Sequence, residues 1–81
     1  MNTMNTIITA EIIENLKIGD IIPNMFGQMK PITRIVGKGT NFKTGKMYLC
    51  VYQQFSESSE MSHSIDEGKT ISIFFGENRN H

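Results

Sequence analysis

The first regular pattern of polar and apolar residues predicts a short helix over residues 9–17. Three aliphatic residues have the three- and four-residue spacing of one buried helix face: Ile12, Ile13 and Leu16. Thr9 has the side-chain oxygen of a good N-cap, and Glu11 falls in the first turn, where the helix dipole favours a carboxylate. Gly19 follows Lys17 by two residues and is typical of a helix end.

The pattern then changes to the two-residue period of β-strands. Alternation is clearest around Leu49 and Val51, which share one face, while Tyr48 and Tyr52 share the other. The remaining candidate strands are shorter, contain β-branched residues and are bounded by Gly, Pro, Asn or Asp. Five strands are predicted, over residues 20–23, 30–38, 46–55, 61–65 and 70–75.

A short helix followed by sequential short strands predicts a mainly β fold, a small five-stranded antiparallel barrel. The long central hairpin, short strand, tight turn and closing strand form a layout that is similar to an SH3-like barrel. The alternation also predicts the inward-facing residues of the barrel: Ile21, Ile32, Met47, Leu49, Val51, Phe55, Ile65, Ile71, Ile73 and Phe75.

A chain of 81 residues is expected to form one domain, residues 1–81, with a small hydrophobic core. Its single cysteine, Cys50, excludes an intrachain disulfide, and His63 and His81 lack the spacing of a structural zinc site. We therefore expect no metal and no cofactor. Further aromatic side chains predict additional apolar surface and hence a homo-oligomer, most simply a dimer: Phe26, Phe74, Tyr48 and Tyr52.

No segment has the pattern of a signal peptide, since residues 1–6 are polar and lack a charged side chain. No apolar run approaches the length of a membrane span. With the lone Cys50, this composition predicts a cytoplasmic protein without a membrane partner.

The net charge is zero, but the charges are unevenly distributed. Residues 21–56 contain no Asp or Glu and carry five basic residues: Lys30, Arg34, Lys38, Lys43 and Lys46. The residues before this stretch sum to −2 and those after it to −3, so a basic centre of +5 lies between acidic ends. This centre is the first candidate for binding an anion.

Catalysis is not predicted by the residue pattern. Cys50 and His63 could form a nucleophilic pair on adjacent strands, but a small strand cysteine and a polar strand histidine explain them as well. The carboxylate pair Glu57 and Glu60 lies in a polar turn where solvated acids are expected. We therefore predict a non-enzymatic protein.

The glycine- and lysine-rich segment 37–46 resembles a P-loop only superficially, because Thr40 and Met47 stand where the motif needs Gly and Ser or Thr. Exposed backbone N–H groups and lysines in a hairpin can still hold an anion. Even spacing predicts Arg34 and Lys38 on one face, and hairpin pairing predicts Lys46 beside Lys38. A solvated, flexible hairpin is the alternative. The predicted ligand-binding residues are Arg34, Lys38, Phe42, Lys43, Lys46, Tyr48 and Tyr52.

Three functions are compatible with this pattern. The first is an accessory or inhibitor-type binding protein, as is common in viruses and mobile elements, that sequesters an anionic, nucleotide-like ligand or blocks a partner protein. The second is a small nucleic-acid-binding barrel in which the tyrosines stack bases, although zero net charge weakens this reading. The third is a protein-interaction or assembly module without a small ligand.

Overall fold

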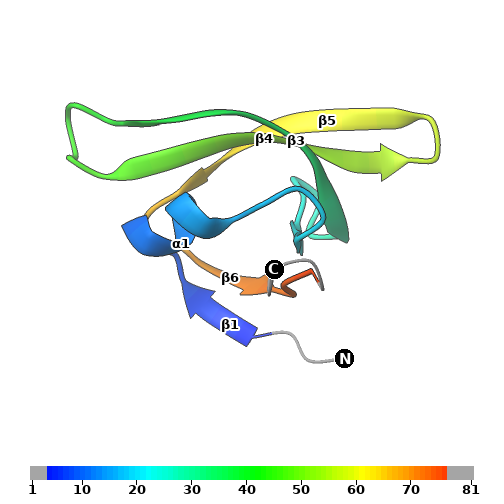
Figure 1. The fold of residues 1–81 in the computed structure, drawn as a ribbon, viewed down its shortest axis with the longest axis horizontal. Helices are drawn as coiled ribbons and strands as arrows, with labels where there is room; N and C mark the ends of the chain where they lie inside the picture. The colour runs from blue at the N-terminus through cyan, green and yellow to red at the C-terminus, as the bar shows by residue number, and fades with distance from the viewer. Residues whose placement is uncertain (1–3, 77–81) are drawn as a thin grey trace.

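A computed structural model describes residues 4–76 and shows a mainly β protein with one short helix (Figure 1). Its elements in chain order are β1 (Met4–Ile7), α1 (Ala10–Asn15), β2 (Ile21–Pro23), β3 (Met29–Thr40), β4 (Met47–Ser56), β5 (Ser59–Asp66) and β6 (Thr70–Ile73). The prediction of a β-rich, antiparallel fold with an N-terminal helix is confirmed. The helix is shorter than predicted, because Leu16 already has an extended backbone.

Strands β2, β3, β4 and β5 form one antiparallel sheet in that order, and β1 pairs with β6. The two sheets are joined where the backbones of Ile21 and Phe74 exchange hydrogen bonds of 2.8 and 2.9 Å. The joined strands curl into a half-barrel, and α1 lies between the β3–β4–β5 layer and the β1–β6 ribbon (Figure 1).

Strand β1 was not predicted, and with it the part of the chain that the structure describes has six strands instead of five. Its sequence, Met4-Asn5-Thr6-Ile7, has little intrinsic strand character. It becomes a strand by pairing with β6, where Thr6 lies opposite Ile71 and Ile7 opposite Thr70. This long-range pairing leaves no mark in the local pattern.

The helix begins as the sequence predicts. The side-chain oxygen of Thr9 accepts a hydrogen bond from the backbone N–H of Ile12 at 3.2 Å, which satisfies one of the free donors of the first turn. The prediction that Gly19 ends the helix is wrong, because the helix already ends at Asn15; the φ of +99° at Gly19 belongs to the next turn, where the N–H of Asp20 donates to the carbonyl of Lys17 at 3.1 Å. No helix among residues 4–76 is long and apolar enough to cross a membrane.

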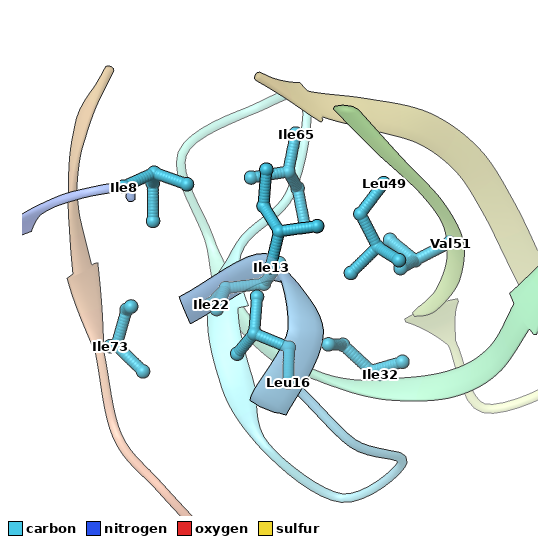
Figure 2. Packing of buried hydrophobic residues seen from close by; sticks show 9 residues of the cluster. All are labelled: Ile8, Ile13, Leu16, Ile22, Ile32, Leu49, Val51, Ile65 and Ile73. Carbon is cyan, nitrogen blue, oxygen red and sulfur yellow. The ribbon is translucent and has the colours of Figure 1, made fainter. Parts of the chain in front are cut away.

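Within residues 4–76 the core consists of nine buried aliphatic side chains, which come from α1 and its C-cap, from β2 to β6 and from the segment between β1 and α1 (Figure 2). They are Ile8, Ile13, Leu16, Ile22, Ile32, Leu49, Val51, Ile65 and Ile73. Five of the predicted inward residues belong to this core, and three more are half-buried against it: Met47, Ile71 and Phe75.

Two predicted core residues were assigned wrongly. Ile22 is buried instead of Ile21, because two adjacent isoleucines in a three-residue strand cannot show which one faces inward. Phe55 is 40% exposed: the core ends at Gln53, and the register shifts between Gln54 and Ser56. The Phe55 ring instead contacts Phe26, with 5.4 Å between ring centroids.

Candidate functional site

Strand β4 presents its two faces as predicted. Leu49 and Val51 are buried on the side that faces the helix, and Tyr48 and Tyr52 are half-buried on the opposite side. In an antiparallel pair, directly opposed residues project from the same face. The pairing of β4 with β3 and β5 therefore decides which of the predicted ligand-binding residues share a surface.

Arg34 and Tyr52 form one cluster on the outer face, the face that carries the tyrosines. They are opposed across the β3–β4 pair, and the guanidinium carbon of Arg34 lies 4.1 Å from the Tyr52 ring centroid. An Nη2 nitrogen of Arg34 also donates to Glu60 of β5 at 3.1 Å. Arg34 is therefore already paired with a carboxylate and an aromatic ring.

Glu60 completes this cluster. Its Oε2 accepts a hydrogen bond from the hydroxyl of Thr33 at 2.5 Å. This hydrogen bond is the main reason that the pKa of Glu60 lies below its ordinary value of 4.5; partial desolvation opposes the shift, and the charge and hydrogen bond of Arg34 add to it. The acid is thus held in its charged form.

Lys38 lies on the other face of β3, so the prediction that it shares a face with Arg34 is wrong. The register shifts by one residue between Ile35 and Gly37, which places Lys38 opposite the buried Leu49. An extra residue in one strand reverses the side-chain alternation beyond it. Lys38 consequently forms an ion pair with Glu14 of α1.

Lys46 is not beside Lys38 either, which corrects the second geometric prediction. The carbonyl of Lys46 accepts from the backbone N–H of Asn41, which places it further along the hairpin. Its ammonium group lies over Gly68, 3.1 Å from where a Cβ of that residue would stand. Because Lys38 and Lys46 are not opposed across the hairpin, the repulsion expected between them does not arise.

The six residues that connect β3 to β4, Asn41 to Lys46, form an ordered turn that we call the hairpin tip. The side-chain oxygen of Asn41 accepts from the backbone N–H groups of Lys43 and Thr44, at 2.8 and 3.4 Å. The Asn41 carbonyl accepts from Gly45 at 2.7 Å, and Gly45 has the positive φ of +72° that closes such a turn.

Phe42 is the fully exposed aromatic residue of the tip. In Figure 1 the tip is the green loop at one end of the β3–β4–β5 layer, and it extends past α1 and β1. The Asn41 hydrogen bonds fix the backbone on both sides of Phe42. A large apolar side chain is thus presented to solvent on a hydrogen-bonded turn.

A shallow hollow of about 520 Å³ lies beside Phe42. It is lined by Thr40, Asn41, Phe42, Lys43 and Tyr48. The Tyr48 ring lies across Gly39, so closely that a Cβ there would stand 2.6 Å from the tyrosine hydroxyl. Three of the predicted ligand-binding residues, Phe42, Lys43 and Tyr48, therefore gather at the tip.

Lys46 borders a second, smaller pocket of about 210 Å³ next to Tyr48. Asp66 and Glu67 line the same pocket, and a carboxylate oxygen of Glu67 accepts from the backbone N–H of Met47 at 2.8 Å. The negative charges of these two carboxylates disfavour the binding of an anion in this pocket. The seven predicted residues thus divide into four groups: Phe42, Lys43 and Tyr48 at the tip hollow, Lys46 at the second pocket, the Arg34–Tyr52 cluster and the Lys38 ion pair.

Cys50 and His63 lie on opposite faces of the sheet. Cys50 is opposed to Ser64, with 3.8 Å between Sγ and Oγ, whereas His63 is opposed to the buried Val51. His63 contacts the side chain of Gln53 through Nε2, and its partial burial lowers its pKa. This geometry matches the structural explanation of both residues rather than a nucleophilic pair.

Sequence reasoning missed the features that join distant segments. Gln53 is fully buried, and its Nε2 donates to the carbonyls of Ile22 and Lys30 at 2.8 and 2.9 Å. The sequence contains one signal of this burial: Gln53 continues the two-residue period of Leu49 and Val51, so it falls on the inward face of β4. Within residues 4–76, no group of three or more His, Cys, Asp or Glu side chains could hold a metal ion.

Comparisons with known proteins add no assignment to this geometry: no protein-family model matches the chain, and neither a curated protein nor a solved structure matches it.

Proposed function

We propose that this chain is a non-enzymatic protein-binding module that blocks or recruits a partner through its hairpin tip. The observation that carries the proposal is the full exposure of Phe42 on a turn whose backbone is held by hydrogen bonds. An exposed ring on a rigid, projecting support is typical of an interface anchor. The ring contributes nothing to the core of its own chain.

The energetics favour a protein pocket as the target of Phe42. Burying a phenylalanine side chain is worth about 1.5–3 kcal/mol. Little of this is lost to ordering, because the Asn41 and Gly45 hydrogen bonds already fix the turn. Lys43 lines the hollow beside the ring, so a partner with a carboxylate next to an apolar pocket would associate faster and in one orientation.

The basic side chains that are not already in ion pairs are too few to favour phosphate binding over protein binding. Arg34 and Lys38 are paired with Glu60 and Glu14, so the +5 of the basic centre is partly neutralised. Affinity for a nucleic-acid strand depends on basic groups that are available to phosphates. Nucleic-acid binding therefore remains the less favoured proposal.

The hollow beside the tip supports a second candidate, a nucleotide-like anionic ligand. Phe42 and Tyr48 line this hollow with Lys43, so a base could stack on a ring while the ammonium group contacts a phosphate. The hollow is open and shallow, and a small ligand there would remain largely exposed to water. For that reason a protein partner fits this surface better.

Site-specific photocrosslinking in the producing cells tests the proposal. p-Benzoylphenylalanine replaces Phe42 in one variant and Ile7, an exposed residue of β1, in the control. We expect a discrete heterologous adduct from position 42 and little from position 7. Equal yields from both positions, or no adduct from either, would overturn the proposal.

Native mass spectrometry of the purified protein separates the two candidates. A retained small molecule that is lost in Phe42→Ala and Tyr48→Phe would favour the nucleotide-like ligand. A protein without a retained ligand, together with a heterologous adduct from position 42, supports the protein-binding function.

The finer fold assignment and the cellular role remain predictions. The half-barrel has the long hairpin, tight turn and short closing strand of the SH3-like layout, and we propose that relationship on layout alone. We also propose an inhibitor or accessory role in the cytoplasm, which rests on the sequence alone.

A further inference from the structure

The two long edges of the β3–β4–β5 layer differ in how they are protected against pairing with another strand. Strand β2 covers β3 only from Met29 to Pro31. The rest of the β3 edge carries Arg34 and Lys38, and its register shifts twice against β4, between Ile32 and Arg34 and between Ile35 and Gly37. Basic side chains and bulges are the usual devices that prevent edge-to-edge association. The β3 edge is therefore protected.

The β5 edge lacks these devices. The strand runs for eight residues, Ser59–Asp66, and pairs with β4 without a register shift from Glu60 to Asp66. It contains no Pro, Lys or Arg, and its two acids stand near its ends. Eight residues exceed the usual strand length of about five to six.

No strand of residues 4–76 pairs with the outer side of β5, which ends the sheet. Its outward backbone N–H and C=O groups form a regular row that another strand can extend. By contrast, β1 is only four residues long, and it offers a much shorter edge. Among the described strands, β5 is thus the long edge best suited to strand addition.

We infer that β5 is a dimer interface, at which a second copy of this chain adds its own β5 in antiparallel orientation around a two-fold axis at Ser62. Such an interface is isologous, so each copy covers the edge of the other and neither remains open. It would join the two sheets into one. The small core of a chain this short makes further association favourable.

The charges of β5 disfavour the register that is centred one residue further along the strand, on His63. With Ser62 on the axis, Glu60 lies opposite Ser64 of the second copy, whose hydroxyl can donate to the carboxylate. With His63 on the axis, Glu60 would lie opposite Asp66 of the second copy, and directly opposed like charges destabilise a sheet. On the inner face, Met61 would lie opposite His63 of the second copy, so two half-buried side chains would cover each other.

The dimer has a geometric consequence for the hairpin tips. The tip lies at the Asp66 end of β5, because Tyr48 is opposed to Asp66. Antiparallel pairing would therefore place the two Phe42 side chains at opposite ends of the continuous sheet. The inference about β5 does not depend on what Phe42 binds.

Two lysine substitutions test the register. In the proposed dimer, Ser62→Lys opposes a lysine to itself, whereas Ser64→Lys places a lysine opposite Glu60 of the second copy. Sedimentation analysis at micromolar concentration should give twice the chain mass of 9.2 kDa for the wild type and for Ser64→Lys. Ser62→Lys should sediment as a monomer while retaining its circular dichroism spectrum.

A monomeric wild type would overturn the inference, as would the same mass for both lysine variants. If Ser62→Lys fails to fold, cysteine crosslinking decides. In a Cys50→Ser background, Ser62→Cys faces its own copy and should form an intermolecular disulfide, with diamide accepting the two electrons and two protons. Ser64→Cys in the same background is the control, and equal crosslinking of the two variants would contradict the register.

Discussion

Gln53 and His63 share a hydrogen bond between the side-chain oxygen of Gln53 and Nε2 of the histidine ring. The amide nitrogen of Gln53 already donates to the carbonyls of Ile22 and Lys30, so its oxygen must be the acceptor. His63 Nε2 therefore carries a proton. This network connects β5, β4 and the β2–β3 pair through one buried side chain.

Replacing Gln53 should destabilise the fold more than replacing its neighbour. Gln53→Met keeps the volume but leaves the Ile22 and Lys30 carbonyls without their donor, and we expect a loss of about 2–4 kcal/mol. Gln54→Met, on the opposite face of β4, is the matched control and should change stability by less than about 1 kcal/mol. Urea unfolding measures both, and equal losses would contradict the role of the network.

His63 should make stability depend on pH in a defined direction. Burial lowers its folded-state pKa below the ordinary value of 6.5, so the unfolded chain binds the proton more readily. Its contribution to stability is complete above pH 6.5 and is lost as the pH falls through the folded-state pKa. The free energy of unfolding should therefore decrease from neutral pH into this window.

His81→Gln is the matched control for this pH dependence, because it removes the other histidine of the chain. Urea unfolding across the same pH range should show the decrease in the wild type and in His81→Gln, but a smaller one in His63→Gln. An unchanged pH dependence in His63→Gln would assign the effect to other groups.

Glu60 should titrate below its ordinary pKa of 4.5, and the Thr33 hydrogen bond is the largest single cause of the shift. Because the folded-state pKa is depressed, the contribution of the carboxylate to stability is present above pH 4.5 and is lost as the pH falls further. In an NMR titration, the pKa of the Glu60 side chain should move towards 4.5 in Thr33→Val and also in Arg34→Gln. An unchanged Glu60 pKa in Thr33→Val would contradict the assigned cause.

Asp20 should be a structural residue of similar importance to Gln53. It is buried, and its two oxygens accept from the backbone N–H groups of Lys17 and Gly76 at 3.0 and 2.8 Å. Asp20→Ala removes both acceptors and should cost about 2–4 kcal/mol. Asp20→Asn retains one oxygen and should cost less; thermal unfolding that shows equal losses would contradict this account.

The sequence predicts those parts of the fold in which a regular period continues without interruption. Leu49 and Val51 were assigned to the core because β4 alternates regularly across them. The same rule failed for Arg34 and Lys38, because one extra residue between Ile35 and Gly37 reverses the alternation. Gly37 stands at this shift, and a glycine inside a strand often marks a bulge, but Gly39 two residues further on carries the same signal without a shift.

Long-range contacts explain the rest of the difference. Lys38 and Glu14 are 24 residues apart, and their ion pair depends on how α1 packs on the sheet. The basic centre therefore looked free in the sequence although part of it is paired in the fold. The tip was predicted better, since Asn41 and Gly45 are local turn residues and bring Phe42 and Lys43 together without distant partners.

The last prediction separates binding from stability at the hairpin tip. Phe42 is fully exposed, so Phe42→Ala should change the free energy of unfolding by less than about 0.5 kcal/mol. Asn41→Ala keeps the ring but removes the acceptor of the Lys43 and Thr44 N–H groups, which loosens the turn.

Photocrosslinking from p-benzoylphenylalanine in place of Tyr48, on the edge of the tip hollow, measures binding in these variants. The heterologous adduct should be almost lost in Phe42→Ala. It should be reduced in Asn41→Ala, because a loosened turn must be ordered when the partner binds. Ile7→Ala, which removes an exposed side chain of β1, should leave the adduct unchanged. If Phe42→Ala retains the full adduct while remaining folded, the tip is not the binding surface.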